Sequence, residues 1–412
     1  MSKTRAGIVA ALDVGSSKVC CFIARADSSG IRVTGIGHQM SKGVRSGTIV
    51  DMDAAEISIR NAVHAAEQMS GQTIEKVMVG VSCGNPASRT VAVEVSIDGY
   101  EIGDDDVSRV LRQGYQSAGA SERDLLHMIP VGFTLDGARV SDPRGMYGDR
   151  LGASLHVVTA NGSAVRNLAT CIERCHLEVE GFVVSPYASG LATLVPDEFD
   201  LGATVVDMGG GTTSLAVFYG GEAIHIDILP LGGGHVTSDI ARGLSTPLAA
   251  AERIKTLYGN AMPLPSDNRE FVDVPQIGEA EHTQAHHVPK SVLVGIIQPR
   301  LEETFELVRS RLEASGFDRL AGRRLVLTGG ASQLPGAADV AARVLDKQIR
   351  LGRPTRLAAI AEATGGPAFA TCAGLLTHMV TKPPAPQRRL PVSVKNGHGL
   401  AGRFGTWLRE NF

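Results

Sequence analysis

The chain has 412 residues, of which 43% are hydrophobic and 20% charged, so it is long enough for two domains with substantial cores. A net charge of −3 and an aromatic content of 4% exclude the basic patches and base-stacking platforms of nucleic-acid-binding proteins. The six cysteines show no zinc spacing, and no apolar run reaches the roughly 18 residues that a spanning helix needs. We expect a soluble cytoplasmic body with packed cysteines.

The first expected element is a strand that ends in a carboxylate and a tight turn. Residues 8–12 lead into Asp13, the turn at 15–18 contains Gly-Ser-Ser-Lys, and residues 20–24 form the return strand. Such a turn leaves backbone N–H groups that a phosphate can approach closely. A single turn of this kind is weak evidence, because most are ordinary hairpin loops.

The pattern changes at residue 85, after a helix over 52–69 and a buried strand over 76–81. Short strands and one acidic-capped helix follow, without a phosphate or catalytic signature, which predicts an inserted α+β module used for interaction. The core pattern then returns, with a strand, a helix, a strand and a connecting helix expected at 155–159, 164–175, 179–184 and 187–194.

The second half begins with VVDMGGGTTS at residues 205–214. A buried strand ends in Asp207, then come three glycines and two threonines, and a strand resumes at residue 215. That resumption differs from the Walker loop and the Rossmann fingerprint, whose glycines open a helix. Asp207 is placed for a hydrated divalent cation, and Thr212 and Thr213 for phosphate oxygens. The match with the Asp13 hairpin indicates an internal duplication.

Glu252 and Lys255 share one face of a helix expected over 249–255, as an exposed ion pair would. The stretch 259–290 contains His282, His286 and His287, and we expect a solvated loop there rather than a metal site. The remaining expected elements are a strand at 224–229, a helix start at 236–241, a helix over 292–314, a strand at 324–328 that runs into Gly-Gly and opens a helix, and a small-residue helix at 368–379.

A proline-containing, basic linker precedes the C-terminal stretch. Five apolar side chains there have helical spacing, with Arg403 and Arg409 on other faces; the five are Leu400, Phe404, Trp407, Leu408 and Phe412. The alternatives are a helix that docks on its own core and one that binds a membrane surface. The long linker favours the membrane, where several copies in a polymer would bind through avidity.

Seven stretches together resemble one family, the FtsA family of bacterial cell-division proteins within the actin-like ATPase superfamily. They are LDVGSSKV, IPVGFTLDG, VVDMGGGTTS, VTSDIA, AERIK, VLTGGASQLPG and FGTWLRENF. The resemblance covers essentially the whole chain. It implies an α/β, two-lobed actin-like fold with a duplicated mixed-sheet core, an inserted α+β subdomain and a C-terminal amphipathic helix on a disordered linker.

The resemblance also implies a division of the chain. Its parts are subdomain IA (1–84 and 161–200, the latter with the connecting helix), the inserted subdomain IC (85–160), subdomain IIA (201–235 and 318–364), subdomain IIB (236–317), a second connecting helix (365–380), a flexible linker (381–398) and a membrane-targeting helix (399–412).

The same resemblance implies ATP and Mg²⁺ as ligands, with Asp13 and Asp207 facing the metal through water. The phosphate contacts would be Gly15, Ser16, Ser17, Lys18, Gly209, Gly210, Gly211, Thr212 and Thr213. The adenosine contacts would be Glu252, Lys255, Gly329, Gly330 and Ala331, which replaces the simple ion pair. Arg300 and Glu303 resemble the surface that receives the C-terminal peptide of the tubulin-like FtsZ.

One position departs from the active ATPases of the superfamily, which the resemblance implies carry Glu or Gln before the proline of the first connecting helix. Here that position is Ser185, which is too short to orient an attacking water well. We therefore expect ATP binding with slow or negligible hydrolysis.

The function implied is an ATP-binding protein that polymerises on the cytoplasmic face of the inner membrane at the division site. There it would anchor FtsZ filaments and help recruit later division proteins. The alternatives are an actin-like component of a pilus or secretion platform, and a sugar or small-acid kinase of the same fold. The tail argues against both alternatives, and Ser185 argues against the kinase.

Overall fold

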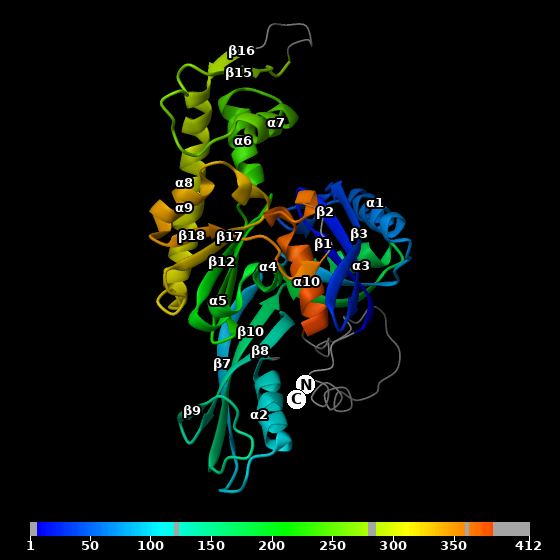
Figure 1. Ribbon diagram of the computed structural model, residues 1–412, viewed down its shortest axis with the longest axis vertical. Coiled ribbons are helices and arrows are strands. Elements are labelled where there is room, and N and C mark those ends of the chain that lie inside the picture. Colours follow the sequence, from blue (N-terminus) through cyan, green and yellow to red (C-terminus); the bar gives the residue numbers. More distant parts are fainter. Residues whose placement is uncertain (1–5, 119–122, 279–285, 359–361, 382–412) are drawn as a thin grey trace.

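The computed structural model describes residues 6–118, 123–278, 286–358 and 362–381. Two central lobes lie side by side, with a small subdomain at one end of the molecule and a long helical tip at the other (Figure 1). The membrane-targeting helix and nearly all of the linker expected before it lie outside the described residues. Within the described residues, no helix combines the length and apolar character needed to cross a membrane.

The two lobes contain sheets of equivalent topology. In lobe I the strand order is β11-β6-β1-β2-β3-β19, and in lobe II it is β14-β13-β12-β17-β18. Each sheet has an antiparallel meander of three strands and, beside the first of them, two further strands parallel to it; in lobe I, β19 adds a sixth strand parallel to β3. The bounds are β1 (Gly7–Val14), β2 (Lys18–Asp27), β3 (Gly30–Met40), β6 (Lys76–Val81), β11 (Glu178–Val184), β19 (Leu357–Ala358), β12 (Ala203–Met208), β13 (Thr213–Tyr219), β14 (Glu222–Leu229), β17 (Arg324–Thr328) and β18 (Gln348–Leu351). The duplication predicted from the two hairpins is confirmed.

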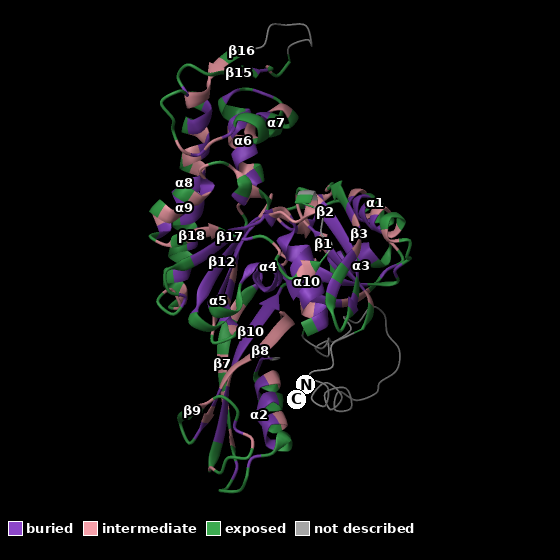
Figure 2. Ribbon diagram, viewed as in Figure 1, coloured by how far each residue is buried: buried purple, intermediate pink, exposed green. Residues whose placement is uncertain are grey.

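Two connecting helices, α4 (Ser185–Thr193) and α10 (Ala370–Thr381), lie between the sheets and are buried with them in one core (Figure 2). They cross at close range, because a Cβ on Gly374 would lie 1.7 Å from the carbonyl oxygen of Ala188. The helix α4 begins at Ser185, two residues earlier than expected, since proline is well tolerated in the first turn.

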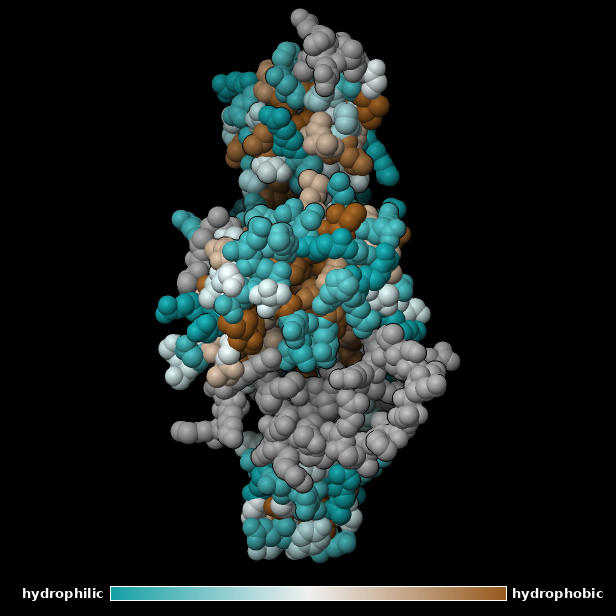
Figure 3. Space-filling view, turned by 90° about the vertical axis from the view of Figure 1, so that its right-hand side faces the viewer, coloured by the Kyte–Doolittle hydropathy of each residue, from teal (hydrophilic) through white to brown (hydrophobic). Residues whose placement is uncertain are grey.

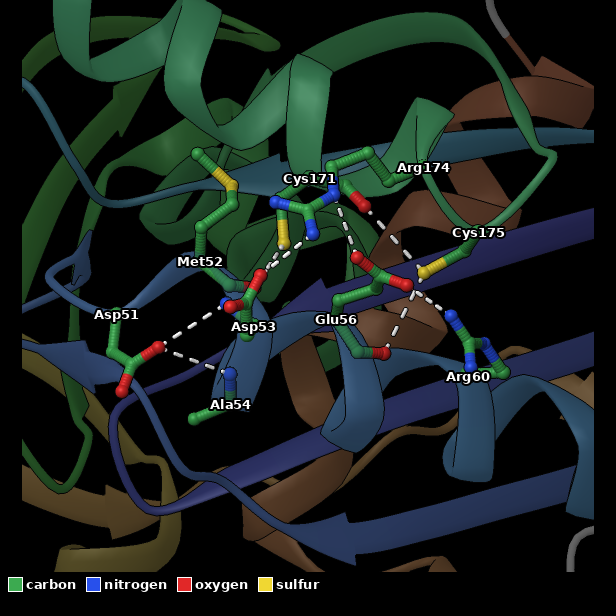
Figure 4. Close-up of polar contacts among 9 residues, drawn as sticks. All are labelled: Asp51, Met52, Asp53, Ala54, Glu56, Arg60, Cys171, Arg174 and Cys175. Atoms are coloured by element: carbon green, nitrogen blue, oxygen red, sulfur yellow. Dashed lines mark hydrogen bonds and ion pairs between the residues drawn. The ribbon is translucent and has the colours of Figure 1, made fainter.

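The outer face of the lobe I sheet is covered by α1 (Met52–Ser70) and α3 (Gly162–Glu173). Arg174, just after α3, pairs with Asp53 and Glu56 of α1 at 2.6 and 2.7 Å (Figure 4). The thiols of Cys171 and Cys175 donate to main-chain carbonyls of α1, and burial raises their pKa to about 12 and about 11. All six cysteines are free, and all are buried except the half-buried Cys175, as expected for packed thiols.

The inserted subdomain has its own sheet and core. Its strand order is β7-β10-β8-β9, and α2 packs on one face of the sheet. The bounds are β7 (Ala87–Ser96), α2 (Asp104–Ala118), β8 (Asp124–Leu135), β9 (Ala138–Val140) and β10 (Arg150–Ala160). The strand expected over 155–159 is part of β10 in the sheet of the insert, within the 85–160 bounds predicted for that subdomain.

Lobe II continues into the tip through helices that cover its outer face. The stretch expected to be a loop contains a two-stranded hairpin, in which His287 Nδ1 lies 2.6 Å from Asp273 Oδ1. His286 also lies in this hairpin, whereas His282 is outside the described residues. The remaining elements are β4 (Val44–Arg45), β5 (Thr48–Ile49), α5 (Pro196–Leu201), α6 (Gly233–Gly243), α7 (Leu248–Tyr258), β15 (Phe271–Val274), β16 (His286–Pro289), α8 (Lys290–Ser315), the 3₁₀ turn η1 (Gly330–Gln333), α9 (Ala337–Leu345), η2 (Glu362–Thr364) and η3 (Pro367–Phe369).

Candidate functional site

A cleft with a volume of about 510 Å³ lies between the two lobes. Its walls come from the turns of both hairpins, the starts of α4, α6 and α10, one face of α7, and the turn at η1. This volume is in the range of small-molecule and cofactor sites. The cleft gathers residues that are far apart in the chain, and it includes nearly all of the predicted phosphate, metal and adenosine positions.

The two hairpins match in register as well as in composition. In each, the aspartate is the second-last paired residue of the first strand, opposite Cys20 for Asp13 and opposite Ser214 for Asp207. Each turn is closed by the same bond, from Gly15 N to the Lys18 carbonyl at 3.0 Å and from Gly209 N to the Thr212 carbonyl at 2.8 Å. Both halves thus present backbone N–H groups and an aspartate to the cleft.

The two turns meet face to face across the cleft. A Cβ on Gly210 would lie 1.6 Å from Ser17 Oγ, and one on Gly211 would lie 2.3 Å from Ser16 Oγ. Ser16 Oγ also accepts a bond from Gly47 N at 2.9 Å. Only glycine fits at the two lobe II positions, and the serine hydroxyls of lobe I occupy the space that the missing side chains leave.

Lys18 lies at the edge of the cleft beside the segment that enters α10. Its Nζ donates to the carbonyl of Ala368 and lies 3.7 Å from the centroid of the Phe369 ring. A lysine at a glycine-containing turn supplies positive charge next to backbone donors, which suits a phosphate.

Asp13 of lobe I is half-buried, and Asp207 of lobe II is buried. Burial raises the pKa of Asp13 to about 6; Lys18 opposes this rise and the charge of Asp207 adds to it. Burial also raises the pKa of Asp207, against bonds from Ser189 and Thr371 that lower it. A divalent cation between two such carboxylates would relieve their repulsion.

The donor set of the cleft therefore fits a hydrated Mg²⁺ held by Asp13 and Asp207. No three His, Cys, Asp or Glu side chains converge anywhere in the described part of the chain. A cation here would keep several waters and depend on ligand oxygens, as Mg²⁺ commonly does beside phosphates.

The remaining predicted adenosine positions lie on the lobe II side of the cleft. Lys255 Nζ lies 2.7 Å from Glu252 Oε2 and also donates to Thr237 Oγ1 and the Gly233 carbonyl. The ion pair expected from spacing is present, and both of its members line the cleft. Gly329 has a φ of +87°, and a Cβ there would lie 2.3 Å from Asp207 Oδ1. The helix expected after the strand β17 begins as a 3₁₀ turn, and the α-helix α9 begins only at Ala337.

A third glycine run completes the cleft and was not predicted as part of it. Gly233 N donates to the Gly209 carbonyl at 2.9 Å, and Gly234 N donates to the Gly210 carbonyl at 2.7 Å. A signal was available, because three successive glycines before a helix resemble the other backbone-donor turns. Lining residues without such a signal are Ser82, Thr256, Leu301, Thr304, Gln333, Leu334, Pro335, Pro367, Ala368 and Thr371.

Four predicted positions differ in their relation to the cleft. Ser185, the first residue of α4, lines it, whereas Thr213 begins β13, is fully buried and is not among the lining residues. Arg300 lies on α8 and pairs with Asp239 on α6, with Nε 2.5 Å from Oδ2. Glu303 is the next partner of Arg300, and both lie outside the cleft lining. The predicted membrane-binding residues are outside the described residues.

Comparisons of the sequence with known proteins give matches along the whole chain. A family model described as "Cell division protein FtsA" matches residues 204–374, and one described as "SHS2 domain inserted in FTSA" matches residues 84–159. The cell division protein FtsA of Rhizobium meliloti is 44% identical over 422 residues, covering 99% of this chain and 96% of that protein. The corresponding proteins of Neisseria meningitidis and Escherichia coli are 34% and 29% identical, each covering 98% of both chains.

Solved structures share the fold at lower sequence identity. A chain of the PilM–PilN type IV pilus biogenesis complex has a TM-score of 0.64 at 19% identity, covering 91% of this chain and 99% of that chain. MreB5 of Spiroplasma citri bound to ADP has a TM-score of 0.55 at 12% identity, covering 90% and 95%. The expected two-lobed, actin-like fold with an inserted α+β subdomain is confirmed.

Proposed function

The chain belongs to the FtsA family of cell division proteins, and we propose that it is an ATP-binding protein that polymerises on the inner membrane. On the cytoplasmic face of that membrane, at the division site, it anchors FtsZ filaments and helps recruit later division proteins. The observation that carries ATP binding is the pair of matched hairpins facing each other across one cleft.

Each part of the cleft suits one part of the nucleotide. The turns at 15–18 and 209–212 offer backbone N–H groups, hydroxyls and the Lys18 ammonium to phosphate oxygens. Glu252 and Lys255 offer polar contacts to the ribose and base, and the 329–331 turn offers a flat backbone surface to the adenosine. Mg²⁺, when bound, supplies charge that neutralises both the phosphates and the two aspartates.

The proposed partner surfaces lie away from the cleft. Arg300 and Glu303 on α8 present a charged, half-exposed pair to a peptide of FtsZ. The tip exposes several large apolar side chains, and brown patches are visible at that end in Figure 3. These residues, which suit contacts between copies in a filament, are Leu257, Tyr258, Leu264, Phe271 and Ile277. The stripe from Leu400 to Phe412 is the proposed membrane contact.

Co-sedimentation with anionic liposomes tests the assembly half of this proposal. Full-length protein is compared with a chain that ends at Lys382, each with and without ATP. We expect only the full-length protein to pellet, and ATP to increase the pelleted amount through avidity. Equal sedimentation of both chains, or of neither, would show that the stretch after Lys382 does not bind membranes.

Slow or negligible turnover is the second part of the proposal, and it depends on Ser185. The side chain lines the cleft but is too short to orient water as a Glu or Gln does. We expect Ser185→Gln to raise the steady-state rate of phosphate release from a low wild-type value. Brisk hydrolysis by the wild-type protein would contradict the assignment.

A further inference from the structure

The two connecting helices each send one hydroxyl to the same oxygen of Asp207. Ser189 Oγ on α4 donates to Asp207 Oδ2 at 2.5 Å, and Thr371 Oγ1 on α10 donates to that oxygen at 3.1 Å. The two hydroxyl oxygens lie 3.0 Å apart. A single carboxylate oxygen of the lobe II hairpin is therefore held from both helices that join the lobes.

The surroundings restrict Asp207 on its other side as well. Its Oδ1 lies where a Cβ on Gly329 would be only 2.3 Å away, so the η1 turn leaves that oxygen room only because residue 329 is glycine. Ser189 is fully buried behind the carboxylate, whereas Thr371 lines the cleft beside it. With Oδ2 engaged by the hydroxyls, Oδ1 is the oxygen left for a hydrated cation.

Thr371 contacts both lobes with one short side chain. Its hydroxyl faces Asp207 in lobe II, and its methyl Cγ2 lies 3.2 Å from the position that a Cβ on Gly80 would take in lobe I. The same Gly80 position lies 3.3 Å from Asp13 Oδ1. Thr371 thus lies between the two aspartates, close to the crossing of α4 and α10 at Gly374.

We propose that Ser189 and Thr371 are positioning residues that fix the rotamer of Asp207 for a metal-bound nucleotide and link it to the crossing of the connecting helices. This inference rests on the proposed nucleotide-binding function of the cleft. Residues that orient groups around a metal are worth about 10- to 100-fold in metal affinity. Because the cation here would be held through water, we expect effects near the lower end of that range.

The test measures the affinity of the full-length protein for a fluorescent ATP analogue, with Mg²⁺ and with EDTA. Thr371→Val keeps the shape of the side chain and removes the hydroxyl. We expect the affinity with Mg²⁺ to fall about ten-fold while the affinity in EDTA stays unchanged. Ser189→Ala is expected to act in the same direction, and Thr371→Ser to restore the Mg²⁺ effect.

Thr377→Val is the matched control, because Thr377 is buried on the same helix but donates to the carbonyl of Ala373 in its own helix. Equal losses with and without Mg²⁺, or a loss in Thr377→Val as large as in Thr371→Val, would indicate a merely structural role and overturn the inference. Thermal unfolding identifies a variant that has failed to fold, and Ser189→Ala then decides the question. If the wild-type protein bound no nucleotide, the proposed function itself would be overturned. If the wild type bound nucleotide and the variants kept its full dependence on Mg²⁺, only the present inference would be overturned.

Discussion

In lobe I the turn between β1 and β2 carries Ser16, Ser17 and Lys18, whereas the equivalent turn in lobe II carries three glycines and Thr212. Both turns have the same length, the same closing hydrogen bond and the same position of the aspartate. The lobe I turn therefore presents serine hydroxyls and a lysine ammonium, whereas the lobe II turn presents mainly backbone N–H groups.

The two turns are complementary in shape. The Ser17 hydroxyl lies where a side chain on Gly210 would be, so the two turns can approach only because one of them has lost its side chains. A duplicated hairpin with serines on both sides would hold the lobes apart. Divergence of the two copies is what allows both to reach one small ligand.

Gly210→Ala breaks this complementarity and is expected to have the largest effect. The added Cβ would overlap Ser17 Oγ, and overpacking of this kind costs about 1–3 kcal/mol. At the upper end the ATP affinity falls about a hundred-fold. Titration with a fluorescent ATP analogue measures the loss. Adding Ser17→Gly, which moves the side chain from one turn to the other, is expected to recover part of the affinity, whereas Gly295→Ala has open space and should be neutral. No recovery in the double variant would contradict the steric explanation.

The two sheets also differ in how their equivalent edge strands are covered. In lobe I the edge strand β3 pairs with β19, which comes from the segment before α10. Among the described residues, the equivalent strand β14 of lobe II has no such strand partner and lies against the insert, although the insert belongs to lobe I in sequence. His156 of β10 and His225 of β14 both lie in this region, close enough for a charge on His225 to affect the pKa of His156.

The buried His156 makes the stability of this contact depend on pH. It is fully buried, and burial with the nearby charge of His225 lowers its pKa to about 4, against a weaker opposing effect of the Ala223 main chain. A histidine that stays neutral when folded stabilises fully above its unfolded pKa of about 6.5, and that stability is lost as the pH falls towards 4. Between about pH 7 and pH 5 the loss from this group is about 2 kcal/mol.

Denaturant unfolding of wild type and His156→Phe at both pH values measures this loss. The variant should show a smaller fall in unfolding free energy, with a remainder from His225, whose pKa burial also lowers. The exposed His64 gives the control, and His64→Gln should show the same fall in unfolding free energy between the two pH values as the wild type. If His156→Phe lost as much unfolding free energy as the wild type between the two pH values, the His156 ring would not be the group that titrates.

Local sequence signals predicted the hairpins, their aspartates and the duplication, because strand, carboxylate and glycines are adjacent in the chain. They did not predict the Ser189–Thr371 pair, whose members are 182 positions apart and meet only because two helices cross. Thr213 differs from Thr212 by one position, and the alternation of the strand turns it into the core.

Ser88 offers the smallest and most local test of how the insert covers lobe II. Its hydroxyl accepts from Ile226 N at 3.0 Å and donates to Ile226 O at 2.9 Å, so one side chain satisfies both outward-facing groups of an edge-strand residue. Ser88→Ala should therefore cost about 1 kcal/mol of unfolding free energy.

The same variant should speed hydrogen exchange at the Ile226 amide, because that N–H loses its partner while the rest of β14 keeps its bonds to β13. Ser96→Ala on the same strand is the control, since its hydroxyl bonds only the exposed Asp98. Exchange at the Ile226 amide that is not faster in Ser88→Ala, or equal effects of both substitutions, would show that the insert does not protect this edge. A loss of protection confined to Ser88→Ala would mean that the insert, which belongs to lobe I in sequence, covers the edge strand β14 of lobe II as β19 covers the edge strand β3 of lobe I.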